Sequence, residues 1–507
     1  LQLLKSQNII MKRPRESCLM LQLALWVALP TSLPAAVTCP PVFGSHMVLQ
    51  QGQPVPVWGT AAAGEKVTVQ FGGAKSQSTA GRDGTWEVKL PPLAASAESR
   101  TLVVTGTNEL RFDDVLVGEV WLCSGQSNME KPLGERNGQR PTDNAEEEIR
   151  NANEPLIRLF QMPRNGRPAK DDLTMQWHPC GSDVVNRLGF SAAAYFFGRS
   201  VQTKLNIPVG LIHTSVGGTR IELWTPPTAY QGIAGLEEVA KAATGDRKLG
   251  DVRIGGLYDP MVMPLVPFAI RGLLWYQGES NLMADDGLIY TEKMRALITG
   301  WRTAWELPEA PFYFVQLAPH TYSARKLPNP FSVEALPLFW EAQTKALSIP
   351  HTGMAVITDT VAQLGDIHPT NKKDVGERLA RIALARTYAM KDVVDSGPVF
   401  NDMRIQGDRI ALKFDHAEGL RARDREDLNE FTIAGEDRVF HPAVAKITKG
   451  NVIVFSPKVG SPVAVRFAWN ERANPNLVNA AGLPARSFRT DDWPVNTHRP
   501  SDPQTEP

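Results

Sequence analysis

Cysteine is scarce in this sequence: the 507 residues contain only four, at positions 18, 39, 123 and 180. None of them stands in a C-x-x-C pair or in the Cys/His spacing of a zinc site. Three remain after the first 36 residues, too few for the disulfide framework of a small extracellular domain. Packed hydrophobic cores must therefore stabilise the fold, and no metal site is expected.

An excess of charge of either sign is also absent. The chain has 54 Lys and Arg residues against 54 Asp and Glu residues, a formal net charge of zero. Nucleic-acid binding is therefore not expected, because a general polyanion binder needs a basic surplus. The hydrophobic fraction of 42% and the charged fraction of 21% are typical of a soluble globular protein. The length predicts two or three domains.

The N-terminal apolar run, Leu19 to Leu29, is too short to span a bilayer comfortably. It follows Met11 and three basic residues, and it precedes small residues at Ala35 and Ala36. This order is typical of a cleaved secretory signal. We assign residues 1–36 to a signal peptide and its upstream residues, and we expect export to the periplasm or secretion, without a stable membrane span after cleavage. An uncleaved membrane anchor is the alternative.

Three patterns follow one another along the remaining chain. Strand-like segments with alternating hydrophobic residues fill residues 37–112 and predict an N-terminal β-domain. In residues 113–395 apolar strands alternate with helical segments, which predicts a parallel sheet covered by helices on both faces. Strands return in residues 396–493, and the Pro- and Asp-rich tail, 494–507, is expected to be disordered.

The central region carries the clearest secondary-structure signals. Strands are expected at residues 115–123, 156–162, 209–215, 270–276, 312–318 and 353–359, and helices at 143–153, 191–205, 290–305 and 372–389. Ligands of such parallel sheets bind beyond the carboxyl ends of the strands. Residues that directly follow the strands are therefore the candidates for chemistry.

Three polar segments occupy these positions: SGQSN at 124–128, VGGT at 216–219 and QGESN at 277–281. The last expected strand leads through Asp359 to a fourth segment, DIHP at 366–369. A serine, a glycine pair, an amide side chain and a histidine preceded by an acid are the components of a serine esterase. Ser127 would be the nucleophile, His368 its general base, and Asp366 the group that orients the imidazole. Asp359 or a backbone carbonyl could orient the imidazole instead.

An oxyanion hole would use the backbone N–H groups of Ser127 and Gly218 and the side chain of Gln277. If the pKa of His368 is unperturbed, activity should rise with pH near 6.5. The candidates for substrate binding are Asn128, Arg220, Glu279 and Asn281.

The neighbours of Ser127 have simpler interpretations. Cys123 ends an apolar strand and is expected in the core, and Ser124 is expected in the turn. Ser127 itself could be only a helix N-cap. A retaining glycosidase with two carboxylates would leave the serine and glycine segments unexplained. A non-catalytic carbohydrate-binding protein with a decayed hydrolase domain is the alternative function.

The segments SGQSNM, GGTRIELW, WYQGESN and DIHPTNK together resemble the SGNH (GDSL-like) hydrolases, and specifically their sialate O-acetylesterase branch. The resemblance runs from about Val42 to Arg381. It implies a three-layer α/β/α sandwich with β-sheet accessory regions at both ends, and hydrolysis of acetyl esters on sugar hydroxyls without a metal or other cofactor. The implied substrate is acetylated sialic acid, with acetylxylan or another polysaccharide as the alternative.

The same resemblance implies Ser127 as the nucleophile, His368 as the base, and Gly218 and Gln277 as oxyanion donors. One departure concerns the orienting acid. Many SGNH enzymes have it three residues before the histidine, where this chain has Gly365, and Asp366 stands only two residues before.

Overall fold

The computed structural model describes residues 36–136, 138–164, 166–167 and 172–499. The expected signal peptide, apart from its last residue, and the tail beyond residue 499 lie outside the described residues. Among the residues described, no helix is both long and apolar enough to cross a membrane.

The core of the protein is a mostly parallel sheet in the spatial order β15-β14-β13-β7-β10-β8-β9. Its strands are β7 (Glu109–Gly125), β8 (Asn153–Gln161), β9 (Trp177–Gly181), β10 (Val209–Ser215), β13 (Gly272–Tyr276), β14 (Phe312–Val315) and β15 (Thr352–Ala355). All pairs are parallel except that between β8 and β9. All six strands expected from the apolar pattern are present.

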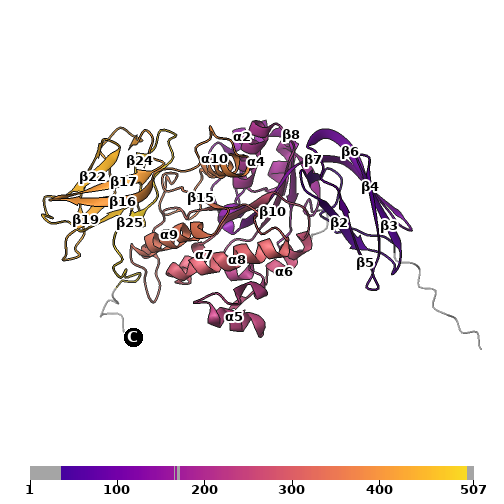
Figure 1. Cartoon of the computed structure of the whole chain (residues 1–507), viewed down its shortest axis with the longest axis horizontal. Helices are drawn as coiled ribbons and strands as arrows, with labels where there is room; N and C mark the ends of the chain where they lie inside the picture. Colours follow the sequence, from indigo (N-terminus) through magenta and orange to yellow (C-terminus); the bar gives the residue numbers. More distant parts are fainter. Residues whose placement is uncertain (1–35, 137, 165, 168–171, 500–507) are drawn as a thin grey trace, which may run out of the picture. The chain divides into compact units, whose positions relative to one another are not determined.

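Helices cover both faces of this sheet (Figure 1). One face is covered by α4 (Ala192–Leu205) and α10 (Lys372–Ile382), the other by α8 (Tyr290–Ala304) and α9 (Ala335–Lys345). Successive β7 residues contribute to opposite cores: Leu122 to the core that contains α8 and α9, and Cys123 to the core that contains α4 and α10. The expected α/β/α sandwich is confirmed, as is the burial of Cys123.

Shorter helices connect these elements. They are α1 (Ser127–Glu130), α2 (Ala145–Asn151), α3 (Ser182–Leu188), α5 (Glu237–Thr244), α6 (Tyr258–Met261) and α7 (Glu279–Met283). The sequence pattern did not predict α9, whose buried face includes Pro337 and the polar Gln343.

The N-terminal β-region is continuous with the central sheet. It contains β1 (Val48–Gln50), β2 (Val55–Thr60), β3 (Lys66–Phe71), β4 (Ala74–Thr79), β5 (Thr85–Leu90) and β6 (Ser96–Thr105). The first half of β7 pairs with β6, and the second half pairs with β10 and β13. The boundary expected after residue 112 therefore falls within a single strand.

The C-terminal region is built from short antiparallel strands. Two four-stranded sheets have the orders β16-β17-β22-β21 and β20-β19-β23-β25, and β18 pairs with β24. The strands are β16 (Val399–Gln406), β17 (Arg409–Asp415), β18 (Arg421–Ala422), β19 (Phe431–Ala434), β20 (His441–Pro442), β21 (Val444–Thr448), β22 (Asn451–Phe455), β23 (Ala464–Phe467), β24 (Leu477–Val478) and β25 (Phe488–Arg489).

The start of the C-terminal tail is ordered, contrary to the expectation of disorder from residue 494. Ser332 N donates to Thr497 O at 2.7 Å, and Arg499 N donates to Pro330 O at 2.9 Å. The ring of His498 also stacks on Phe331. Backbone pairing with the loop before α9 supplies the order that the polar composition of the tail did not indicate.

Candidate active site

Ser127 lies at the first position of α1, directly beyond the carboxyl end of β7. His368 lies in the loop between β15 and α10. Ser127 Oγ is 2.9 Å from His368 Nε2, a hydrogen-bond distance. The hydroxyl can donate to this nitrogen only if the imidazole carries its proton on Nδ1.

The carboxylate of Asp366 holds the histidine loop by its backbone. Asp366 Oδ1 accepts from His368 N at 2.8 Å, whereas it lies 3.9 Å from His368 Nδ1, beyond hydrogen-bond distance. Arg140 donates to Asp366 Oδ2 at 2.9 Å. Asp366 is therefore placed to fix the loop and to act on the ring through its charge.

Asp359, the other acid considered as an orienting group, is engaged elsewhere. Both of its oxygens accept from Arg378, at 2.6 and 2.8 Å. This bidentate pair holds the start of the loop against α10 and leaves Asp366 as the acid beside His368.

The surroundings of His368 favour a neutral ring. Burial lowers its pKa from the ordinary 6.5 to about 4, and the nearby charges of Lys372, Lys131 and His320 act in the same direction. Asp366 opposes them. At neutral pH the imidazole is therefore unprotonated and able to accept the proton of Ser127.

The loop after β10 packs against Ser127. A Cβ on Gly217 would lie 3.1 Å from Ser127 Cβ, and Gly218 has a φ of +74°. Glu130 Oε2 accepts from Gly217 N at 2.8 Å and fixes this loop to α1. Within the described chain, the N–H groups of Ser127 and Gly218 have no acceptor, so both are available to a developing oxyanion.

The side chain of Gln277 is not available in this way. It is fully buried and absent from the cavity lining. Its Nε2 donates to Asn281 Oδ1 at 2.6 Å and to Gln126 Oε1 at 3.1 Å. Asn281 is also fully buried and bonds to Glu222. Both expected site residues therefore brace the loops beneath the cavity instead of facing a substrate.

A cavity of about 510 Å³ opens at Ser127 and His368. Its walls include Gln126, Glu130, Arg136, Gln139, Arg164, Gly217, Gly218, Arg220, Glu279, Ser280, Met283, Arg325 and Ile367. Of the expected substrate-binding residues, Arg220 and Glu279 line it. Asn128 does not; it is 1% exposed.

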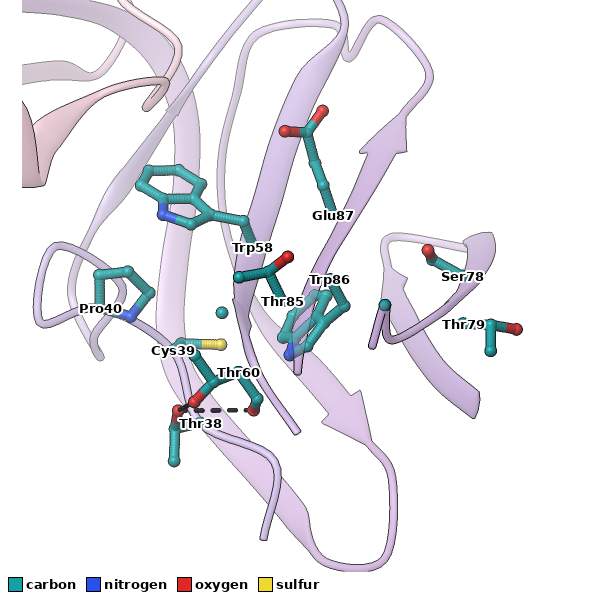
Figure 2. A pocket seen from close by; sticks show the side chains of 12 residues that line it. Thr38, Cys39, Pro40, Trp58, Thr60, Ser78, Thr79, Thr85, Trp86 and Glu87 are labelled. Carbon is teal, nitrogen blue, oxygen red and sulfur yellow. Dashed lines mark hydrogen bonds between the residues drawn. The ribbon is translucent and has the colours of Figure 1, made fainter. Parts of the chain in front are cut away.

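A larger hollow of about 790 Å³ lies on the N-terminal β-region, around Trp58 and Trp86 (Figure 2). The hydroxyls of Thr38 and Thr60 are 2.7 Å apart at its edge. Its lining contains no histidine, so a serine there has no base.

A second serine–histidine contact lies inside β10. Ser215 Oγ is 2.5 Å from His213 Nε2, and Gln161 Oε1 is 3.0 Å from His213 Nδ1. Both residues are buried on one strand, and neither lines the cavity at Ser127. The glycine pair after β10 packs against Ser127.

Several residues around the site gave no signal in the sequence. Gln139 Nε2 lies 3.5 Å from His368 Nε2, and Arg140 binds Asp366. Both belong to the segment between α1 and α2, which follows no strand. Lys372 lies in the first turn of a helix, after the N-cap Asn371, and nothing in the sequence indicates that it is buried.

Among the residues that the structure describes, no three His, Cys, Asp or Glu side chains are grouped as ligands for a metal ion. The contact between Ser127 and His368, beside two N–H groups without acceptors, is the kind of arrangement that a serine esterase uses.

Comparisons with known proteins identify relatives of this chain. The family described as carbohydrate esterase, sialic acid-specific acetylesterase, matches residues 117–385. Sialate O-acetylesterase of Homo sapiens is 27% identical over 451 residues, covering 82% of this chain and 83% of the relative. The Mus musculus enzyme is 28% identical over 490 residues, covering 84% and 88%. A crystal structure of a carbohydrate acetylesterase from Xanthomonas citri is 35% identical, with a TM-score of 0.79; the match covers 90% of this chain and all of the other.

The pH dependence of activity should reflect the buried histidine. Because His368 must be neutral to accept a proton, kcat/KM should rise with pH through about 4 and be constant above it. The measurement is kcat/KM for an aryl acetate between about pH 3 and pH 8, with samples returned to neutral pH to check reversibility. A midpoint at the ordinary 6.5 would contradict the burial argument.

Replacing Asp366 by Asn should have a moderate effect. Asn retains an oxygen for His368 N but removes the charge, so kcat/KM should fall about 10-fold, against about 10⁴-fold for an acid hydrogen-bonded to the ring. The acid limb should move to lower pH, because Asp366 raises the pKa of His368. A larger loss in Asp359→Asn, assayed in parallel, would identify Asp359 as the orienting acid instead.

Proposed function

The chain belongs to the sialic acid-specific acetylesterase family of carbohydrate esterases and is a carbohydrate O-acetylesterase; we propose that Ser127 and His368 carry out its reaction. The observation that carries this proposal is the 2.9 Å contact between Ser127 Oγ and His368 Nε2, beside two N–H groups without acceptors. Each group has a defined part in ester hydrolysis.

In the first half of the reaction, His368 Nε2 takes the proton of Ser127 while Oγ attacks the acetyl carbonyl carbon. The carbonyl oxygen becomes an oxyanion and accepts from the N–H groups of Ser127 and Gly218. Each such donor contributes about 3 to 4 kcal/mol to transition-state stabilisation. The C–O bond to the sugar then breaks, and His368 returns its proton to the departing sugar hydroxyl.

In the second half, water replaces the sugar. His368 takes one proton from the water as its oxygen attacks the acetyl-Ser127 carbonyl, and the same N–H groups hold the oxyanion again. Collapse breaks the acyl bond, the proton returns to Ser127 Oγ, and acetate leaves. The charge of Asp366, 3.9 Å from His368 Nδ1, favours the imidazolium in both halves.

The substrate we propose is an acetylated sialic acid, because the cavity is bordered by arginines. Arg136 and Arg164 both pair with Glu130, at 2.5 and 2.7 Å. Arg220 lies 3.4 Å from Glu222. Arg325 has no acidic partner in the described part of the chain, and its guanidinium is free for a substrate carboxylate.

Export is a further part of the proposal. It rests on the basic and apolar residues between Met11 and Ala36, which have the order of a secretory signal.

Replacing the nucleophile should abolish the reaction. Ser127→Ala should lower kcat for an aryl acetate by more than about 10⁴-fold, because the other serine that lines the cavity, Ser280, has no hydrogen bond to a histidine in the described part of the chain. Ser124→Ala is the matched control: Ser124 is fully buried and its hydroxyl has no partner, so kcat should stay within about threefold. Substantial activity in the Ser127 variant would refute the assignment.

Arg325→Met should separate charged from neutral substrates. KM for an O-acetylated sialoside should rise about tenfold through loss of a charge-assisted hydrogen bond, while KM for a neutral aryl acetate should not change. Arg82→Met, at an exposed position outside the cavity, is the control. An unchanged sialoside KM, or a higher kcat/KM on acetylated xylan, would point to a neutral polysaccharide.

A further inference from the structure

A buried polar chain lies beneath the site, formed by Lys372, Asn128 and Glu279. Lys372 Nζ donates to Asn128 Oδ1 at 2.7 Å, and Asn128 Nδ2 donates to Glu279 Oε1 at 2.5 Å. Lys372 and Asn128 are each 1% exposed. Lys372 Nζ also lies 4.9 Å from the ring centroid of the fully buried Tyr276. These hydrogen bonds thus join α10, α1 and α7.

Asn128 connects the nucleophile to its base. It directly follows Ser127, and its Nδ2 also donates to the carbonyl oxygen of Ile367, the residue before His368, at 3.0 Å. The amide thus bonds to three separate segments. Any shift of Asn128 would change the distance between Ser127 Oγ and His368 Nε2.

A buried lysine is energetically unfavourable at this position. Burial disfavours the ammonium and lowers the pKa of Lys372 to about 7; Lys131 adds to this, and Glu279 and Asp366 oppose it. Burial also raises the pKa of Glu279. A methionine would fill a similar volume without a buried charge. Stability alone therefore does not account for Lys372.

We infer that Lys372 is a positioning residue of the esterase: through Asn128, its buried amino group holds the turn of Ser127 in register with the loop of His368. The inference rests on the proposed roles of Ser127 and His368. Neither Lys372 nor Asn128 lines the cavity, so neither touches the substrate. A displacement of about 1 Å between nucleophile and base can cost about 100-fold in rate.

The charge of Lys372 also acts on His368. Other charged groups face this ring: Asp366 on the same loop, paired with Arg140, Lys131 after α1, and His320 after β14. Lys372 is protonated in the acidic range where His368 titrates. Its charge there keeps His368 neutral to lower pH. Removing it should move the acid limb of kcat/KM to higher pH.

The test is Lys372→Met, with Lys373→Met as control. Lys373 is the next residue of α10 and is exposed. In Lys372→Met, kcat for an aryl acetate per phosphonate-titrated serine should fall about 10- to 100-fold, with KM within about twofold and the acid limb at higher pH. Lys373→Met should match the unmodified enzyme in all three quantities.

Other outcomes overturn the inference. If Lys372→Met lowers only the melting temperature, while kcat per titrated serine and the acid limb stay unchanged, the lysine is merely structural. If that variant does not fold, Asn128→Ser breaks the same links from α1, and kcat at the unmodified value would equally refute positioning. Activity in Ser127→Ala, measured alongside, would show instead that the proposed function has failed.

Discussion

The hydrogen bond between Ser127 and His368 joins residues 241 positions apart in the chain, and the site depends on it. The parallel order β15-β14-β13-β7 places the strand before His368 and the strand before Ser127 in one sheet, with their carboxyl ends at one edge. The glycine loop after β10 and the buried amides after β13 then pack around α1. The sheet is therefore the scaffold that brings Ser127 and His368, which are far apart in the sequence, into contact.

Burial changes the pKa of His368 more than the carboxylate of Asp366 does. Asp366 bonds to the backbone of His368 and to Arg140, and it influences the ring only through its charge. Burial and the cations around the ring keep His368 neutral. In the proposed mechanism, His368 is thus unprotonated over a wide pH range, and the carboxylate of Asp366 stabilises the imidazolium that forms during the reaction.

Much of this arrangement could be predicted from the sequence. Near-continuous apolar runs such as residues 115–123 predict a sheet buried on both faces, and strand ends locate the polar segments of a parallel sheet. Side-chain direction within those segments could not be predicted. Asn128, Gln277 and Asn281 stand beside reactive positions, yet they bond inward, because their buried partners come from distant segments. Helical periodicity also could not predict that Lys372 is buried.

The central claim is that Ser127 is the residue that becomes acylated. A fluorophosphonate reacts covalently with a serine activated by a neighbouring base, and mass spectrometry of the digested protein locates the adduct. The account predicts one adduct per chain, on Ser127, with loss of esterase activity in proportion to labelling. An adduct on Ser124 or on Ser215, which contacts His213, or full activity with Ser127 labelled, would contradict it.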